Sequence, residues 1–210
     1  IPAPASGIMV ARRLAPPPMC ANYRPASREA LAALPLPPPD FGYGEAYPGS
    51  VVPVVTNFAP RQWVPALFGL VPAWAHDLKI IRSTYNARSE TLGEKPSFRH
   101  AWQRGQLCII PAEVLFEPCY ETGKSVRWAI RRADGKPMGI AGLWDQWKSP
   151  GGETVHSFTM LTINADRHPL MNLFHKPTDE KRMVVILEPE QFEDWLQAPA
   201  TRSMEFLQPF

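Results

Sequence analysis

Proline is the residue that most constrains how this chain can fold. The 210-residue sequence contains 25 prolines, and many of them cluster in connecting segments such as PLPPPD at residues 35–40. Proline fixes its own φ angle and has no amide hydrogen, so it interrupts the interior of helices and of central strands. We therefore expect long, stiffened loops and short helices rather than long ones.

Apolar runs rich in β-branched residues, bounded by turn residues, predict the strands. These runs cover residues 51–55, 63–71, 107–112, 126–132, 137–144, 156–163 and 182–187. The prolines inside the first two indicate edge positions or bulges. Short helices are expected at 27–34, 97–105 and 189–197, from a capping Ser27, a terminating Gly105 and a proline in the first turn. Several strands with few short helices predict a single α+β, mainly-β, barrel-like domain.

Composition is that of a globular protein with a real core, at 45% hydrophobic and 20% charged residues. No run approaches the roughly 18 apolar residues of a membrane span, so no membrane contact is expected and the cytoplasm is the default location. Cys20, Cys108 and Cys119 are odd in number and lack zinc spacing, so we expect no disulfide framework, metal or other cofactor. The net charge of +2 falls near zero without Arg12 and Arg13, which argues neither for nor against nucleic acid.

The first eighteen residues, IPAPASGIMVARRLAPPP, do not look like part of the domain. Their apolar patch precedes Arg-Arg, which is the reverse of the charge order of a signal peptide. We interpret residues 1–18 as an N-terminal extension (a cloning remnant, a mis-set start or a propeptide) and residues 19–210 as one domain. Met19-Cys20 follows the extension directly. If Met19 is the natural start, its removal leaves Cys20 as the first residue.

Cys20 therefore has two interpretations. An internal cysteine is usually buried and inert. An N-terminal cysteine carries a thiol beside an amine whose pKa is roughly 7.7–8.0, so part of the amine is neutral and nucleophilic near neutral pH. Such an amine forms an imine with an aldehyde, and the neighbouring thiol can then close a five-membered thiazolidine ring.

The segment NARSET, which begins at Asn86, packs an amide, a guanidinium, two hydroxyls and a carboxylate into six residues. One interpretation is a loop-to-helix junction with an N-cap at Asn86 or Ser89 and Glu90 in the first turn. The functional interpretation has Asn86 orienting a reacting group and Arg88 holding a phosphate bidentately.

Glu117 and His175 each lie beside apolar segments. Glu117 either points outward from a strand, which is the commoner case, or lies in a pocket where desolvation raises its pKa toward the range of a general acid. A single histidine beside an apolar face is usually structural, but His175 could equally transfer a proton near neutral pH.

Taken in order, the motifs of this chain resemble those of the SRAP family. They are MC, EAYPGS, FGLVPAW, NARSET, CIIPAEVLFEP, GIAGLW, LTINAD and a histidine before RMVVIL, and they run from Met19 to about Leu187. SRAP proteins are SOS-response-associated peptidase-like proteins that react covalently with abasic sites in single-stranded DNA. The resemblance implies the mainly-β, barrel-like SRAP fold and a DNA-damage role. It also implies a lyase-like crosslinking activity in a family that is classed as peptidase or hydrolase.

The resemblance also implies which residues react. Cys20 matches the nucleophile that bonds to the opened sugar aldehyde. Asn86 matches an asparagine expected to hydrogen-bond the cysteine amine or the adduct. Glu117 and His175 match the groups that handle protons during ring opening and imine formation.

Four further residues match DNA contacts of the family. Arg24 and Arg88 match phosphate-binding arginines, and Phe68 falls where an aromatic wedge lies beside an unstacked base. Trp74 matches the tryptophan that closes the same motif, with a core position as the alternative. The implied partner is single-stranded DNA that contains abasic sites, bound by a monomer that is nucleoid-associated when on DNA.

The chain departs from the family pattern at four places, one of which is that the usual C-terminal segment with its Val-Asn is not visible in ATRSMEFLQPF at residues 200–210. Pro118 stands where the family has a tryptophan after the glutamate. Residues 176–181, KPTDEK, add a charged loop after His175. The opening CANYRP replaces Cys-Gly-Arg, which makes Arg24 a looser match.

Three hypotheses remain open on the sequence. The first is a protein that shields abasic sites through a thiazolidine link. The second is a cysteine peptidase or N-terminal-nucleophile hydrolase that removes residues 1–19 autocatalytically, with Glu117 and His175 activating Cys20. The third is a non-catalytic single-stranded nucleic-acid binder in which Cys20 only packs. If residues 1–19 stay attached, the Cys20 nitrogen is an amide and cannot form an imine.

Overall fold

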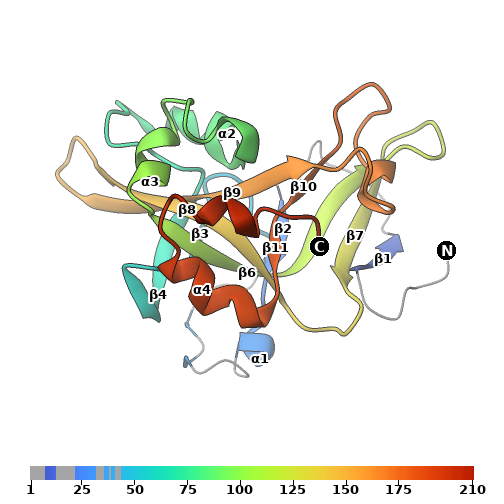
Figure 1. Cartoon of the computed structure of the whole chain (residues 1–210), viewed down its shortest axis with the longest axis horizontal. Coiled ribbons are helices and arrows are strands. Elements are labelled where there is room, and N and C mark those ends of the chain that lie inside the picture. The colour runs from blue at the N-terminus through green and yellow to red at the C-terminus, as the bar shows by residue number, and fades with distance from the viewer. Residues whose placement is uncertain (1–7, 13–21, 32–35, 38, 41–43) are drawn as a thin grey trace.

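The computed structural model describes residues 8–12, 22–31, 36–37, 39–40 and 44–210, with only the backbone for 8–12. These residues form a mainly-β fold with short helices (Figure 1). The strands are β1 (Ile8–Arg12), β2 (Tyr23–Pro25), β3 (Val51–Thr56), β4 (Ala59–Phe68), β5 (Asn86–Arg88), β6 (Leu107–Cys119), β7 (Val126–Arg132), β8 (Met138–Lys148), β9 (Thr154–Asn164), β10 (Arg182–Val184) and β11 (Ile186–Leu187).

The helices are short, as the proline content predicts. The α-helices are α1 (Arg28–Leu31), α2 (Ile81–Thr84), α3 (Arg99–Gln103) and α4 (Phe192–Gln197). The 3-10 helices are η1 (Leu78–Ile80), η2 (Ser89–Thr91), η3 (Met171–Leu173), η4 (Pro189–Gln191) and η5 (Ser203–Phe206). Helix α4 packs on β6, where the buried Trp195 donates its indole N–H to the carbonyl oxygen of Cys108 at 2.9 Å. No helix in the described segments is both long and apolar enough to cross a membrane.

Five strands close into a barrel, which confirms the predicted fold class. Strands β6, β3, β4, β9 and β8 pair in that order, and β8 then pairs with β6 to complete the circle. The remaining strands extend it: β7 and β2 pair with β6, β5 and β10 pair with β9, and β11 pairs with β8. Strands β4 and β5 run parallel to β9, and the other pairs are antiparallel.

The long strands show little alternation between buried and exposed residues because both of their faces are covered. Nearly all residues of β6, β8 and β9 are buried or half-buried. Phe68 at the end of β4 stacks on Phe158 of β9, with ring centroids 5.1 Å apart and an interplanar angle of 10°. Such aromatic stacking inside a barrel buries a large apolar area and holds neighbouring strands in register.

The seven predicted strand runs and the three predicted helices are present, but the run at 182–187 is divided, and β1, β2 and β5 were not predicted. Helix α3 ends before Gly105, whose φ angle of 61° is one that glycine adopts readily. Pro53 and Pro65 lie opposite each other in β3 and β4, and the register shifts between Val54 and Thr56, which is the predicted bulge. The single strand expected at 182–187 is divided, because β10 pairs with β9 whereas β11 pairs with β8.

Part of the expected N-terminal extension belongs to the sheet. Residues Ile8–Arg12 form β1, which pairs antiparallel with β7 from Ile8 opposite Arg132 to Arg12 opposite Trp128. The expectation that residues 1–18 stand apart from the fold therefore does not hold for residues 8–12.

Candidate functional site

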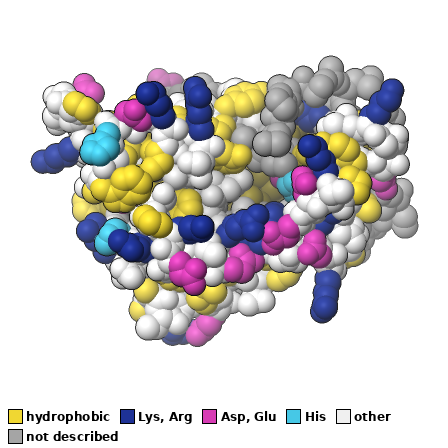
Figure 2. Space-filling model, turned by 90° about the horizontal axis from the view of Figure 1, so that it is seen from above, with side chains coloured by type: hydrophobic (Ala, Val, Ile, Leu, Met, Phe, Trp, Pro, Cys, Tyr) yellow, Lys and Arg dark blue, Asp and Glu magenta, His cyan; other side chains and the backbone are white. Residues whose placement is uncertain are grey.

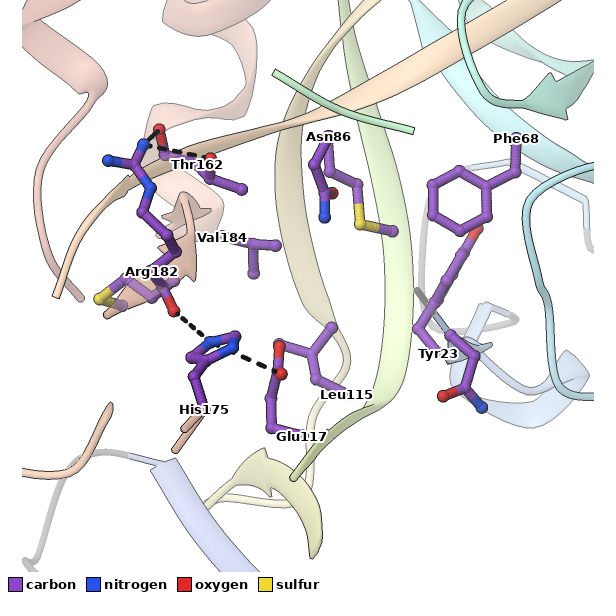
Figure 3. A pocket seen from close by; sticks show the side chains of 12 residues that line it. Tyr23, Phe68, Asn86, Leu115, Glu117, Thr162, His175, Arg182 and Val184 are labelled. Carbon is purple, nitrogen blue, oxygen red and sulfur yellow. Dashed lines mark hydrogen bonds and ion pairs between the residues drawn. The ribbon is translucent and has the colours of Figure 1, made fainter. Parts of the chain in front are cut away.

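A pocket opens where β2, β5, β6 and β10 approach one another (Figure 3). It brings together three of the four residues predicted to react. Other apolar and polar side chains form the rest of its lining. Its lining residues are Asn22, Tyr23, Phe68, Asn86, Leu115, Glu117, Met160, Thr162, His175, Arg182, Met183 and Val184. Cys20, the fourth predicted residue, lies outside the described residues.

Glu117 and His175 face each other across the pocket. Oε2 of Glu117 lies 3.7 Å from Nε2 of His175, and the two side chains are 12% and 13% exposed. Strand β6 turns Glu117 inward together with Leu115, whereas Phe116 packs in a separate cluster on the other face. The outward orientation of Glu117, the commoner case for such a pattern, is therefore wrong for this strand.

His175 is held by its backbone and by its ring. Its φ angle is 64°, a left-handed conformation that is rare for a residue other than glycine. The amide of His175 donates to the carbonyl oxygen of Pro118 at 2.8 Å, and Nε2 lies 3.1 Å from the carbonyl oxygen of Arg182. A carbonyl oxygen only accepts, so Nε2 carries the proton in this bond. Backbone strain at a pocket residue is typical of functional sites.

Asn86 enters the pocket from β5, which places it opposite Met160 of β9. Figure 3 shows its amide directed toward the space in front of Glu117 and His175. Oδ1 of Asn86 is buried and has no hydrogen-bond partner within the described residues. A buried acceptor without a donor destabilises a fold by about 1–3 kcal/mol, so this atom indicates a donor that belongs in the pocket.

A second buried oxygen lines the same pocket. The hydroxyl of Tyr23, on β2, has no hydrogen-bond partner within the described residues, and burial raises the pKa of this group. The sequence interpretation did not include Tyr23, Thr162 or Arg182. Only the position of Tyr23, three residues after Cys20, could have singled it out.

A cluster around Glu45 anchors the start of β2. Its carboxylate accepts hydrogen bonds from Asn22 Nδ2 at 3.0 Å, Tyr47 Oη at 2.9 Å and Arg127 Nη2 at 2.6 Å. Burial raises the pKa of Glu45, but the bonds from Arg127 and Tyr47 outweigh it and the net pKa is lowered. The charge of the half-buried Arg24 lowers that pKa further.

The NARSET segment forms β5 followed by η2, and its charged side chains form ion pairs with those of residues 176–182. Arg88 Nη1 lies 2.7 Å from Glu180 Oε2, and Arg182 binds both carboxylate oxygens of Glu90, at 2.8 and 2.9 Å. The Arg182 bonds lower the pKa of Glu90 to about 2 despite partial burial. An N-cap at Asn86 or Ser89 is wrong, because η2 begins after Arg88 without a side-chain cap.

The two predicted aromatic contacts lie in different surroundings. Phe68 is 1% exposed and forms a wall of the pocket, so an exposed wedge at this position would need its packing against Phe158 to open. Trp74 is 49% exposed, and its indole N–H donates to the carbonyl oxygen of Pro96 at 3.3 Å. The core alternative for Trp74 is therefore wrong. Within the described residues, no group of three or more His, Cys, Asp or Glu side chains could hold a metal ion.

This barrel brings an amide, a carboxylate and an imidazole around one pocket, and these are groups that can take part in acid–base chemistry. The family model described as "SOS response associated peptidase (SRAP)" matches residues 38–210. The chain belongs to the SRAP family.

Relatives and solved structures agree with this assignment. The chain is 30% identical over 167 residues to the abasic site processing protein YoqW of Bacillus subtilis, a match that covers 79% of this chain and 70% of that protein. It is 28% identical over 177 residues to the mouse abasic site processing protein HMCES, covering 70% of this chain and 48% of that protein. A crystal structure of a Bordetella bronchiseptica protein superposes with a TM-score of 0.83 at 37% identity, covering 91% of this chain and 94% of that one.

Proposed function

We propose that this chain processes abasic sites in single-stranded DNA by covalent capture through Cys20, as part of the DNA damage (SOS) response. Two of its relatives carry the name of abasic site processing proteins. The observation that carries the proposal is the convergence of Asn86, Glu117 and His175, from three separate segments, on the pocket that Asn22 also lines.

The position of Asn22 supports a role for Cys20, although Cys20 lies outside the described residues. Asn22 follows Cys20 by two positions in the sequence and lines the pocket. Asn22 is fixed by its bond to Glu45, and β2 continues from it along β6. The proposal requires Cys20, two positions before Asn22, to reach the reacting groups of the pocket.

The proposed reaction uses the ring-opened sugar of an abasic site, which carries an aldehyde. The free amine of Cys20 attacks the aldehyde carbon, and the resulting carbinolamine loses water to give an imine. The thiol sulfur then bonds to the imine carbon, and its proton passes to the nitrogen, which closes the thiazolidine. The adduct therefore has the mass of protein plus DNA less one water.

The pocket residues fit the needs of these steps. Glu117 and His175 can give a proton to the departing hydroxyl and take one from the attacking amine. Oδ1 of Asn86 can accept a hydrogen bond from the amine or from the adduct nitrogen. The exposed side chains of Arg88 and Trp74 offer phosphate binding and base stacking outside the pocket.

A cysteine peptidase or N-terminal-nucleophile hydrolase is the alternative function, and the word peptidase in the name of the family supports it. In that reaction the Cys20 sulfur attacks a peptide carbonyl while His175 and Glu117 move the protons. Removal of residues 1–19 by such a cut would expose the Cys20 amine. The hydrolase reaction could therefore come first and covalent capture second.

Intact mass spectrometry tests the proposal. The 210-residue chain and a chain beginning at Cys20 are each measured before and after mixing with single-stranded DNA that carries one abasic site. We expect the chain beginning at Cys20 to gain the mass of the DNA less one water. Neither the 210-residue chain nor the Cys20→Ala variant of the shorter chain should gain it. Loss of residues 1–19 from the longer chain before any adduct would support the hydrolase. If neither chain forms an adduct, covalent capture is wrong.

A further inference from the structure

Hydrogen bonds join the two ends of the charged loop of residues 176–181, which lies beside the pocket. The loop lies between His175 and Arg182. The carbonyl oxygen of Arg182 lies 3.1 Å from Nε2 of His175. Lys181 Nζ donates to the carbonyl oxygens of His175 at 3.2 Å and Lys176 at 2.6 Å. The loop projects above the sheet in the view of Figure 1. These bonds hold the Lys181 side chain against the backbone of His175 and Lys176.

Glu180 is the residue of this loop that contacts the NARSET segment. Oε2 accepts from Arg88 Nη1 at 2.7 Å, while Oε1 accepts from Arg182 Nη1 at 2.9 Å and from Asn164 Nδ2 at 3.2 Å. Its carboxylate thus bridges two arginines, whose guanidinium groups can also bind a phosphate group. Basic and acidic side chains lie next to one another in a band across the face seen in Figure 2.

The two arginines differ in how easily they can exchange partners. The Arg182 side chain is 12% exposed and also binds Glu90 and the Thr162 carbonyl oxygen, at 2.7 Å for the latter. The Arg88 side chain is 59% exposed and forms an ion pair with Glu180. Exposed ion pairs of this kind are weak and screened by salt, so Arg88 can leave Glu180 for another anion.

We propose that Glu180 is an affinity-determining residue that competes with a DNA phosphate for Arg88. This inference rests on the proposed function, because it takes single-stranded DNA as the ligand. A strand whose phosphate reaches Arg88 must displace the carboxylate, and the displaced negative charge then remains beside the phosphate. Glu180 therefore weakens the binding of any single strand and makes occupancy of the site depend on additional contacts, such as those of the pocket with an abasic sugar.

The Glu180→Gln variant of the 210-residue chain tests this role. Glutamine keeps the shape and the acceptor oxygen but removes the charge. We expect its Kd for an undamaged single-stranded oligonucleotide, measured by fluorescence anisotropy, to fall by roughly two- to fivefold at low salt. The plot of log affinity against log salt should become steeper by about 0.7, the value for one additional phosphate contact on a single strand.

Two further variants assign the effect to Arg88. Arg88→Gln should weaken binding more in the Glu180→Gln background than in the original chain, because only there is the guanidinium unopposed. Glu205→Gln is the matched control, since Glu205 pairs with the exposed Arg202 at 3.1 Å and lines no part of the pocket. We expect it to leave both the Kd and the salt dependence unchanged.

The outcomes separate this inference from the proposed function. If the original chain binds single strands and Glu180→Gln binds them equally or more weakly, Glu180 only shapes the loop and the inference is overturned. An equal gain in Glu205→Gln also overturns it, because the effect is then one of net charge. If no variant binds single strands even at low salt, the DNA ligand itself is wrong and both proposals fall. Because the oligonucleotide is undamaged, none of these results depends on the Cys20 amine.

Discussion

Nε2 of His175 lies 3.7 Å from Oε2 of Glu117, with both side chains close to fully buried. At this separation a small shift of either side chain, or one bridging atom, connects the pair for proton transfer. The Arg182 carbonyl oxygen orients the imidazole from the other side. The pair therefore has a fixed geometry before any ligand enters, although its members lie 58 positions apart in the sequence (175 minus 117).

Replacing Glu117 by glutamine should separate proton transfer from binding. The amide fills the same space but cannot take up and return a proton. We expect the rate of adduct formation by the chain beginning at Cys20 to fall by about 10²- to 10³-fold. The affinity for undamaged single strands should stay unchanged. Glu113→Gln, on the same strand but outside the pocket, is the control. An adduct rate unchanged in Glu117→Gln would remove Glu117 from the mechanism.

Two substitutions of His175 should distinguish its backbone from its ring. Alanine and glycine both remove the imidazole, so each should slow adduct formation by roughly 10²-fold or more. Only glycine relaxes the backbone at a φ angle of 64°. We therefore expect His175→Gly to be more stable than His175→Ala by about 1 kcal/mol in urea unfolding. Equal stabilities would show that the left-handed conformation costs nothing here.

The Glu90–Arg182 pair should contribute to stability in acid. The folded-state pKa of Glu90 is lowered to about 2, so its carboxylate is favoured in the folded chain. Such a group contributes its full stability above its ordinary pKa and loses it as the pH falls from about 5 to 2. Glu90 is 49% exposed, so solvent screening limits the contribution to about 1 kcal/mol or less.

Thermal unfolding between pH 7 and pH 2 checks this contribution. Glu90→Gln should lower the Tm at pH 7 by about 1–4 °C, and the difference from the original chain should vanish near pH 2. The exposed Glu94 provides a control, and Glu94→Gln should leave the Tm nearly unchanged across this range. A difference at pH 7 that persists at pH 2 would assign the effect to shape rather than charge.

Local signals in the sequence were enough for the long strands and for the helices α1, α3 and α4, but not for β1, β2, β5 or α2. Apolar runs, the terminating Gly105 and the proline at the start of η4 depend only on near neighbours, and the structure retains them. The orientation of Glu117 could not be predicted in this way. Strand β6 is covered on both faces, so its sequence lacks the alternation that would reveal an inward side.

Long-range pairings decided the rest of the site. Asn86 faces the pocket because β5 runs parallel to β9, a pairing that no local pattern specifies. The ion pair between Arg88 and Glu180 joins positions 92 residues apart. The charged loop was visible in the sequence as a departure from the family pattern, but its partner became apparent only in three dimensions.

Gly69 connects the stability of the fold to the shape of the pocket. It follows Phe68, a pocket wall, and its amide donates to the carbonyl oxygen of Phe158 at 2.9 Å. Its φ angle is 115°, which L side chains rarely adopt, and an added Cβ would lie 2.5 Å from Ile81 Cβ and 2.9 Å from Ile81 Cα. An alanine at this position must therefore strain the backbone and move helix α2 at the same time.

We expect Gly69→Ala to lower the free energy of unfolding by at least about 2 kcal/mol in urea denaturation, from backbone strain and overpacking together. Gly93→Ala is the matched control, because a Cβ there meets nothing within 4 Å. It should be neutral or stabilising by less than about 1 kcal/mol. Because the strain acts on Phe68, Gly69→Ala should also slow adduct formation at temperatures where the chain is still folded. A variant that is destabilised but reacts at the original rate would show that the pocket does not depend on this wall.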